Sequence, residues 1–334
     1  IEEIHNNTGI DPWFLNEIAE IVYLENHHSS LDDLELLKKN GFSDIQVGAL
    51  TNHTAEEIRQ IRNERNLKPV YKVVDTCAGE FAAETPYSYS TYESTHDIEP
   101  LDGQKVMILG GGPNRIGQGI EFDYCCVQAV YGLREAGFKS IMVNCNPETV
   151  STDFDLADRL YFEPITFEDI MNIIEFEKPD GVLVQFGGQT PLKIAEQLTN
   201  EGVKIFGTSS ASIDLAENRE EFARIVKKLK IQIPEYCIAK NYDEIINFSE
   251  VAKFPVLVRP SYVLGGRAMQ IVYNKEQLVD YVFRSAEATN DHPILIDQFI
   301  ENAFEFDVDA LCDGEEVFIA GIMQHIEEAG VHSG

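Results

Sequence analysis

The sequence predicts an α/β protein with three parts: an N-terminal helical region, a doubly wound parallel sheet and a second α+β domain. Capping residues and helical periodicity run through residues 1–69, and apolar strands alternate with helices and glycine-rich loops over 104–206. Strand–helix–strand alternation is typical of parallel sheets, and a chain of 334 residues suggests two or three domains. We therefore expect a helical domain with its linker over 1–98, a sheet domain over 99–206 and a final domain over 207–334.

The composition excludes several classes of protein. The 57 acidic and 26 basic residues give a formal net charge of −31, which repels nucleic acid. The six cysteines form no C-x-x-C pair, which favours a reducing, cytoplasmic environment, and we expect Cys125 and Cys126 to be buried. No apolar run reaches the roughly 18 residues of a membrane helix, and there is no signal peptide. Because the chain starts at Ile1 and stops at Gly334 in a polar stretch, we expect a piece of a longer protein.

Residues 1 to 69 carry the signals of successive helices. One is expected over Pro12–Leu24, Ser30 is expected to cap a second that Gly41 ends, and Thr54–Glu57 forms a capping box that opens a third. We expect one stripe of the first helix to hold Trp13, Phe14, Ile18, Ile21 and Val22, and the second to turn Leu31, Leu34, Leu36 and Leu37 inward, with Lys38 and Lys39 at its negative end. Nothing here resembles a ligand cluster, so helical packing or an assembly surface is the predicted role.

Residues 70 to 103 differ in character from the helices before them. Tyr71–Thr76 is a candidate strand, and Tyr87–Tyr92 is rich in aromatic and hydroxyl side chains. We expect these tyrosines to pack against a neighbouring domain, and the turn-rich segment His96–Gly103 to be a linker.

The sheet domain is predicted from alternating strands and helices. The expected strands are Lys105–Leu109, Ser140–Asn144, Gly181–Val184 and Lys204–Phe206, and the expected helices cover about 120–136, 167–177 and the residues up to Asn200. The loops Asn146–Thr152 and Gln185–Pro191 follow strands, so we expect them at the carboxyl edge of the sheet, where substrate crevices lie.

The glycine-rich loop Gly110–Gly119 matches neither common nucleotide motif. A G-x-G-x-x-G reading from Gly110 places Arg115 at the last glycine, and the second strand ends at Asn144 rather than at an acidic residue. Gln118–Gly119 stands where a P-loop needs Lys-Ser/Thr. The sequence therefore disfavours a nicotinamide oxidoreductase and a Walker-type ATP site.

The last domain contains the residues with the clearest chemistry. A helix over Ser212–Leu229 carries Arg219, and a hairpin over Val256–Tyr273 carries Arg259, Gly265 and Gly266. Glycine N–H groups and guanidinium forks both suit phosphate oxygens, although an ordinary glycine hairpin with solvated arginines stays an alternative. Further elements are expected as helices near 242–252 and 275–286 and a strand over 293–297.

Three carboxylates recur on the strand that follows. Glu305, Asp307 and Asp309 share one face of Glu305–Leu311 by the two-residue period. They are candidates for metal ligands, for a ribose clamp or for a solvated edge. Asp313–Gly314 predicts a hairpin turn into Val317–Met323.

Five phrases of the sequence resemble the carbamoyl-phosphate synthase large-chain family, in particular the second of its two ATP-using halves. These phrases are long and specific, and the resemblance covers nearly all of the chain. They are Lys105–Cys126, Val143–Asp153, Phe186–Pro191, Val258–Arg267 and Gly330–Gly334.

The resemblance implies a fold and a reaction. Residues 1–98 correspond to the end of a helical oligomerisation domain, 99–206 to a Rossmann-like pre-ATP-grasp domain and 207–334 to an incomplete ATP-grasp domain. The implied reaction is phosphorylation of carbamate by ATP to carbamoyl phosphate, with Mg²⁺ (Mn²⁺ as a substitute) and K⁺ as ions. The implied setting is cytoplasmic pyrimidine and arginine biosynthesis, in an oligomer with the rest of the large chain and a glutaminase small subunit. Bicarbonate and ammonia would be substrates of the whole enzyme.

The resemblance also assigns roles to residues of this chain. It implies that Arg219 and Arg259 bind phosphates, that Gly265 and Gly266 cover them, that Gln298 and Ile300 hold adenine and that Glu305 holds the ribose. It places Gly330, Val331, His332 and Ser333 beside the nucleotide. It places the Mg²⁺ ligands beyond Gly334, so we expect the chain alone to be inactive and to bind ATP weakly. Phosphoryl transfer needs positioning and charge neutralisation more than a protein nucleophile, which suits these residues.

Two other readings stay open at this point. A different ATP-grasp enzyme, such as a biotin carboxylase or a peptide-forming ligase, would share the hairpin but not the phrases at 105–126 and 143–153. Alternatively, the chain is a non-catalytic assembly fragment.

Overall fold

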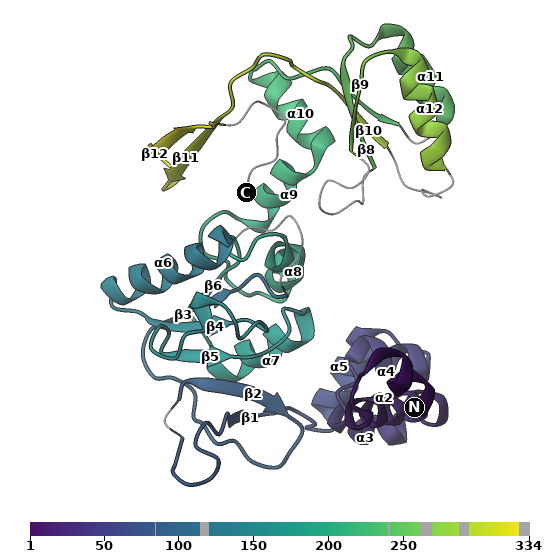
Figure 1. Ribbon diagram of the computed structural model, residues 1–334. Helices are drawn as coiled ribbons and strands as arrows, with labels where there is room; N and C mark the ends of the chain where they lie inside the picture. The colour runs from purple at the N-terminus through teal and green to yellow at the C-terminus, as the bar shows by residue number, and fades with distance from the viewer. Residues whose placement is uncertain (84, 114–119, 240, 261–268, 287–293, 327–334) are drawn as a thin grey trace. The chain divides into compact units, whose positions relative to one another are not determined.

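The computed structural model describes residues 1–83, 85–113, 120–239, 241–260, 269–286 and 294–326. The chain divides into two compact units, one running to Asp214 and the other beginning at Leu215, and each is described by itself. The first unit holds the helices of the N-terminal region and a six-stranded sheet, and the second holds a four-stranded sheet and a separate hairpin (Figure 1). The predicted α/β fold class is confirmed.

The N-terminal region is helical throughout. Its elements are α1 (Glu2–Thr8), α2 (Pro12–His27), the 3-10 turn η1 (Leu31–Asp33), α3 (Leu34–Lys39), α4 (Asp44–Thr51) and α5 (Ala55–Glu64). Ser43 and Thr54 start α4 and α5 with complete capping boxes. The core of this region consists of Leu24, Leu34, Leu37, Phe42, Val47 and Ile58.

One expectation for these helices was wrong, because Leu36 is exposed rather than turned inward. Ser30 caps the 3-10 turn η1, which runs directly into α3. Lys38 and Lys39 lie in the last turn of α3 as expected, and Lys38 is in addition buried in ion pairs. The expected stripe of α2 exists, but its side chains are exposed, because the core uses Leu15 and Leu24 from the same helix.

The six-stranded sheet has the order β1-β2-β5-β4-β3-β6. Its strands are β1 (Val70–Val73), β2 (Tyr87–Thr91), β3 (Lys105–Leu109), β4 (Lys139–Val143), β5 (Arg159–Tyr161) and β6 (Gly181–Leu183). The β1–β2 pair is antiparallel and the other neighbours are parallel. Tyr87–Thr91 is thus a strand of the sheet itself, and Lys204–Phe206 contributes only a bridge between Ile205 and Val182.

Helices cover both faces of this sheet. One face packs on α7 (Phe167–Glu177) and α8 (Gln189–Asn200) through a core that includes Met107, Ile141 and Ile170. The other packs on α6 (Glu121–Glu135), and the turn η2 (Val150–Thr152) lies against the same helix. Cys126 of α6 is buried as expected, whereas its neighbour Cys125 is exposed, because consecutive helical residues face different directions.

The second unit begins within α9 (Ser210–Glu217) and continues with α10 (Arg219–Lys228). The single helix expected here is broken, because the side chain of Asn218 caps α10 by accepting hydrogen bonds from the N–H groups of Glu220 and Glu221. The sheet that follows has the antiparallel order β7-β10-β8-β9, with β7 (Tyr236–Ala239), β8 (Val256–Pro260), β9 (Gln270–Val272) and β10 (Ile294–Gln298). Helices α11 (Tyr242–Val251) and α12 (Lys275–Ala286) pack on one face of it.

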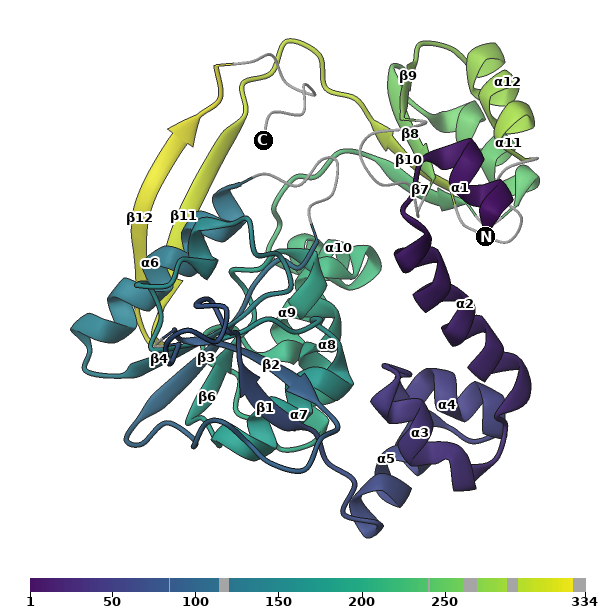
Figure 2. The ribbon, with the colours of Figure 1, turned by 60° about the horizontal axis from the view of Figure 1, so that its bottom comes forward.

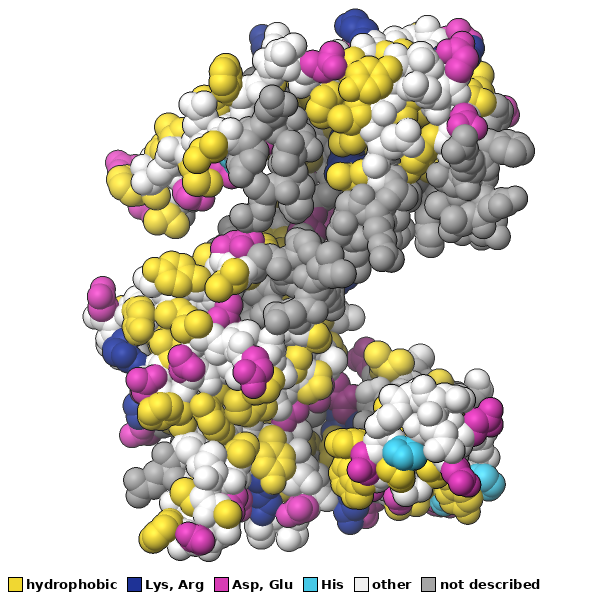
Figure 3. All heavy atoms as spheres, viewed as in Figure 1, with side chains coloured by type: hydrophobic (Ala, Val, Ile, Leu, Met, Phe, Trp, Pro, Cys, Tyr) yellow, Lys and Arg dark blue, Asp and Glu magenta, His cyan; other side chains and the backbone are white. Residues whose placement is uncertain are grey.

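Strands β11 (Phe306–Cys312) and β12 (Val317–Gln324) form a long hairpin (Figure 2). Gly314 takes a φ of 104° in its turn, and the carboxylate of Asp313 accepts hydrogen bonds from the N–H groups of Glu315 and Glu316, as the Asp-Gly signal predicts. Every residue of the two strands is exposed, apolar side chains included, and Figure 3 shows some of these side chains from one side. Across the described residues, no helix is both long and apolar enough to span a membrane.

Candidate functional site

Arg259 stands on the face of the four-stranded sheet that α11 and α12 leave uncovered. Along β8, Val256 and Val258 are fully buried in the core, so the two-residue period turns Leu257 and Arg259 to the opposite face. In the neighbouring strand β10, Ile294 and Ile296 belong to the core, and Asp297 shares the face of Arg259. Arg259 is paired with Leu295 in the register, and Asp297 is paired with Leu257, so the two charged side chains are diagonal neighbours.

Arg219 reaches the same face from α10. The cap at Asn218 makes Arg219 the first residue of that helix. Its guanidinium lies 5.4 Å from the centre of the Tyr236 ring, and Tyr236 is the register partner of Asp297 on β7. Arg219 also forms an ion pair with Asp297. Helix α10 and the sheet therefore bring the two arginines together.

Asp297 joins the two guanidinium groups. Its Oδ2 lies 3.4 Å from Nη2 of Arg259, and its other oxygen contacts Nη2 of Arg219. Partial burial and the nearby charge of Arg259 lower the pKa of Arg219 from its ordinary value. Two cations on one carboxylate leave a net positive charge on an open sheet face, which is the electrostatic requirement of a phosphate site.

The other predicted site residues lie in different places. Gly265, Gly266, Gly330, Val331, His332 and Ser333 lie outside the described residues. Gln298 ends β10, where its N–H donates to the carbonyl of Glu235 at 2.7 Å, and Ile300 is exposed beyond it. Glu305 precedes β11, with its Oε2 at 3.8 Å from Nδ1 of His325. The role of each of these residues stays a prediction.

The carboxylates of the hairpin contact a histidine. Nε2 of His325 lies 2.8 Å from Oδ2 of Asp307, and the register of the hairpin shifts only after Asp309. Within the part of the chain that the structure describes, no group of three or more His, Cys, Asp or Glu side chains could hold a metal ion.

Sequence reasoning missed Asp297. A signal was present, because the strand Ile-Leu-Ile-Asp-Gln places an acidic residue opposite its apolar face. Only the strand order β8–β10, however, shows that this carboxylate lies beside Arg259.

The carboxyl edge of the six-stranded sheet, in the first unit, is closed by tight glycine packing. Strand β3 has β4 on one side and β6 on the other. The strand order therefore reverses at β3, which makes its carboxyl end a topological switch point. A Cβ on Gly187 would lie 2.4 Å from the carbonyl oxygen of Gly110. The N–H of Gly112, at a φ of 74°, donates to Oδ1 of Asn144 at 3.1 Å. Glycine at these positions therefore allows close backbone approach between the loops.

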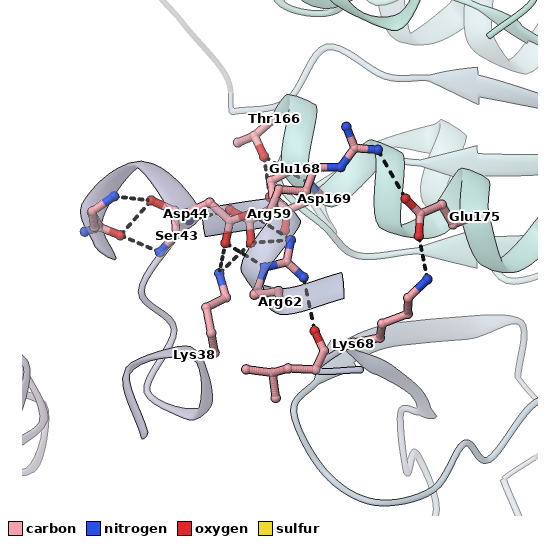
Figure 4. A network of polar contacts seen from close by, with 12 residues as sticks. Lys38, Ser43, Asp44, Arg59, Arg62, Lys68, Thr166, Glu168, Asp169 and Glu175 are labelled. Carbon is pink, nitrogen blue, oxygen red and sulfur yellow. Dashed lines mark hydrogen bonds and ion pairs between the residues drawn. The ribbon is translucent and has the colours of Figure 1, made fainter. Parts of the chain in front are cut away.

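A hollow in the first unit, with a volume of about 1010 Å³, lies between the N-terminal helices and the sheet. Lys38, Asp44 and Glu168 line it and belong to a network of ion pairs (Figure 4). Arg62 holds Asp44 through two contacts of 2.7 Å, and Nζ of Lys38 contacts Asp44 at 3.2 Å and Glu168 of α7 at 2.5 Å. Oε2 of Glu168 accepts the N–H of Asp44 at 2.7 Å. The network therefore attaches the helical region to α7.

Two other carboxyl groups line this hollow. Burial raises the pKa of Glu163 to about 7 and that of Asp169 to about 6, and each is raised further by a neighbouring carboxylate. Glu163 accepts a hydrogen bond from the N–H of Ser90. Both groups therefore titrate near neutral pH.

Comparisons with known proteins agree along the whole chain. The models for the carbamoyl-phosphate synthetase large chain oligomerisation domain, the carbamoyl phosphate synthase preATP-grasp domain and the carbamoyl-phosphate synthase L chain ATP binding domain match residues 1–66, 102–215 and 218–327. Carbamoyl phosphate synthase large chains of Pasteurella multocida and Archaeoglobus fulgidus are each 56% identical, over 341 and 345 aligned residues. Each alignment includes 100% of this chain and 32% of the relative, so the chain spans about a third of the relatives' length.

Solved structures show likeness of fold at low identity. The biotin carboxylase domain of Hydrogenobacter thermophilus 2-oxoglutarate carboxylase, solved with MgADP, ADP and bicarbonate, has a TM-score of 0.52 at 18% identity, covering 65% of this chain and 49% of that one. An ADP complex of purK, an N5-carboxyaminoimidazole ribonucleotide synthetase, has a TM-score of 0.53 at 15% identity, covering 70% and 56%. These likenesses support the α/β architecture alone.

Proposed function

Because the chain belongs to the carbamoyl-phosphate synthase large-chain family, we propose that its second unit binds the phosphate chain of ATP for the phosphorylation of carbamate. The observation that carries this proposal is the meeting of Arg219 and Arg259 at Asp297 on an open sheet face. The order of oligomerisation, preATP-grasp and ATP-binding domains supports assignment to the half of the large chain that forms carbamoyl phosphate.

The proposed chemistry is phosphoryl transfer between two anions. An oxygen of carbamate attacks the γ-phosphorus of ATP, the bond to the β,γ-bridging oxygen breaks, and carbamoyl phosphate and ADP leave. Carbamate is itself the nucleophile, so the protein contributes orientation and positive charge. Arg219 and Arg259 supply that charge through forked N–H donors. Mg²⁺ would supply further neutralisation, and the described residues hold no ligand set that fits it.

The wider role follows from the same family membership. We propose that the chain works with the remainder of a large chain and with a glutaminase small subunit that supplies ammonia, in a cytoplasmic enzyme that also uses bicarbonate and a second ATP. Pyrimidine and arginine biosynthesis consume carbamoyl phosphate. The match of residues 1–66 to an oligomerisation domain supports self-association through the helical region. K⁺ and Mn²⁺ are further proposed ions.

Calorimetric titration of the chain with ATP tests the proposal. We expect Arg259→Ala to weaken ATP binding about tenfold, because one charge-assisted contact to phosphate contributes roughly 1.5–3 kcal/mol. Arg224→Ala is the matched control, since Arg224 is an exposed arginine on α10 that pairs with Glu221. Equal affinities of the Arg259 variant, the control and the wild type would refute the phosphate assignment.

A further inference from the structure

We propose that Asp297 is a positioning residue that holds Arg219 and Arg259 in the geometry that receives the phosphate chain. This inference rests on the proposed function of the two arginines and goes beyond it, because it concerns how the pair is prepared before the nucleotide arrives.

The three side chains are layered from the sheet outward. Asp297 belongs to β10, an interior strand between β7 and β8, and its side chain is 13% exposed. The side chains of Arg219 and Arg259 are 32% and 38% exposed. The carboxylate therefore lies behind the guanidinium groups, and the more exposed groups are the ones that an incoming anion would reach.

The arginines come from two separate elements of the second unit. Arg219 opens α10, and Arg259 lies near the end of β8. Like charges repel, and the charge of Arg259 already lowers the pKa of Arg219. A carboxylate that contacts both groups offsets this repulsion. Without it, we expect the two guanidinium groups to move apart into solvent.

Asp297 leaves donors of the pair unused. Nε of Arg259 is buried and has no hydrogen-bond acceptor among the described residues. Buried donors normally have a partner, so an unused one beside an open cationic face indicates an acceptor that comes from outside the protein. Phosphate oxygens are acceptors of this kind. The single carboxylate of Asp297 therefore holds both guanidinium groups in place, and the cluster keeps one net positive charge for the ligand.

Asp297→Glu separates position from charge, because it keeps the carboxylate and moves it outward by one methylene. Asp243→Glu makes the same change at an exposed position on α11 and is the control. The first readout is the NMR signal of the two guanidinium groups, assigned with Arg219→Lys and Arg259→Lys. The second is the affinity for ATP by calorimetry, with thermal unfolding to verify the fold.

In the wild type we expect restricted guanidinium rotation for both arginines. In Asp297→Glu we expect free rotation and at least tenfold weaker ATP binding, with the control unchanged. Should Asp297→Glu fail to fold, Asp297→Asn keeps the side-chain shape and must still release both groups. Two results would overturn the inference. One is free rotation of the guanidinium groups in the wild type, and the other is unchanged guanidinium rotation and ATP affinity in the Asp297 variants. Absence of ATP binding by the wild type would count against the proposed function instead, while the NMR readout still decides the role of Asp297.

Discussion

Glu163 makes the stability of the first unit depend on pH. Its side chain is 94% buried by the sheet and the helical region, and burial raises its pKa from an ordinary 4.5 to about 7. The folded protein therefore holds this proton more tightly than the unfolded chain does. The stability associated with the neutral carboxyl is fully present below pH 4.5 and is lost as the pH rises through 7.

The size of the effect follows from the shift in pKa. One pKa unit corresponds to about 1.4 kcal/mol, so the change from 4.5 to about 7 predicts a loss of roughly 3 kcal/mol between pH 4.5 and pH 8. Glu163→Gln replaces the carboxyl with a neutral amide whose oxygen can still accept the N–H of Ser90. The variant should match the wild type at pH 4.5 and exceed it by roughly 3 kcal/mol at pH 8.

Urea denaturation at a series of pH values measures the difference, with circular dichroism and hydrogen exchange at β2 as probes of the first unit. Glu56→Gln removes an exposed carboxylate that lines the same hollow and serves as the control. If the difference in unfolding free energy between Glu163→Gln and the wild type stayed constant across the pH range, the reasoning would be refuted. Titration of Glu163 would then make no contribution to stability.

Three further predictions concern stability. Asp44→Ala leaves the buried cations Arg62 and Lys38 with Glu168 as their one shared carboxylate, so unfolding should cost about 3 kcal/mol less. Lys39→Ala, at an exposed position, should change little in the same melting experiment. Gly187→Ala should destabilise by roughly 1–3 kcal/mol, because its Cβ would lie 2.4 Å from the carbonyl of Gly110. Gly132→Ala is the control: a Cβ at this helical position meets open space, so the change should stabilise the protein by up to about 1 kcal/mol. A Gly187→Ala variant more stable than Gly132→Ala would contradict the packing argument. Asn218→Ala removes the cap of α10 and should cost about 1 kcal/mol, seen as a lower melting temperature of the second unit; no change would show that Arg219 is placed by other contacts.

The elements were largely predictable because their signals are local. The capping box at Thr54, the Asp-Gly turn at Gly314 and the apolar runs of β3 and β8 each depend on a few neighbouring residues. The break at Asn218 was local too, but helical periodicity on both sides concealed it. Strand β5 was missed because its residues, Arg-Leu-Tyr, form no apolar run, and its place depends on the neighbouring strands β2 and β4.

The amino-acid sequence by itself determined the fold class, the family and the two arginines, since motifs and periodicity depend on residue identity and spacing along the chain. Only the tertiary structure decided that Asp297 joins those arginines, that Lys38 is buried on Glu168 and that Glu163 titrates near neutrality. The physical reason is the same in each case. Burial and the attraction between charges depend on distances between residues that are remote in sequence, and strand order and helix packing set those distances.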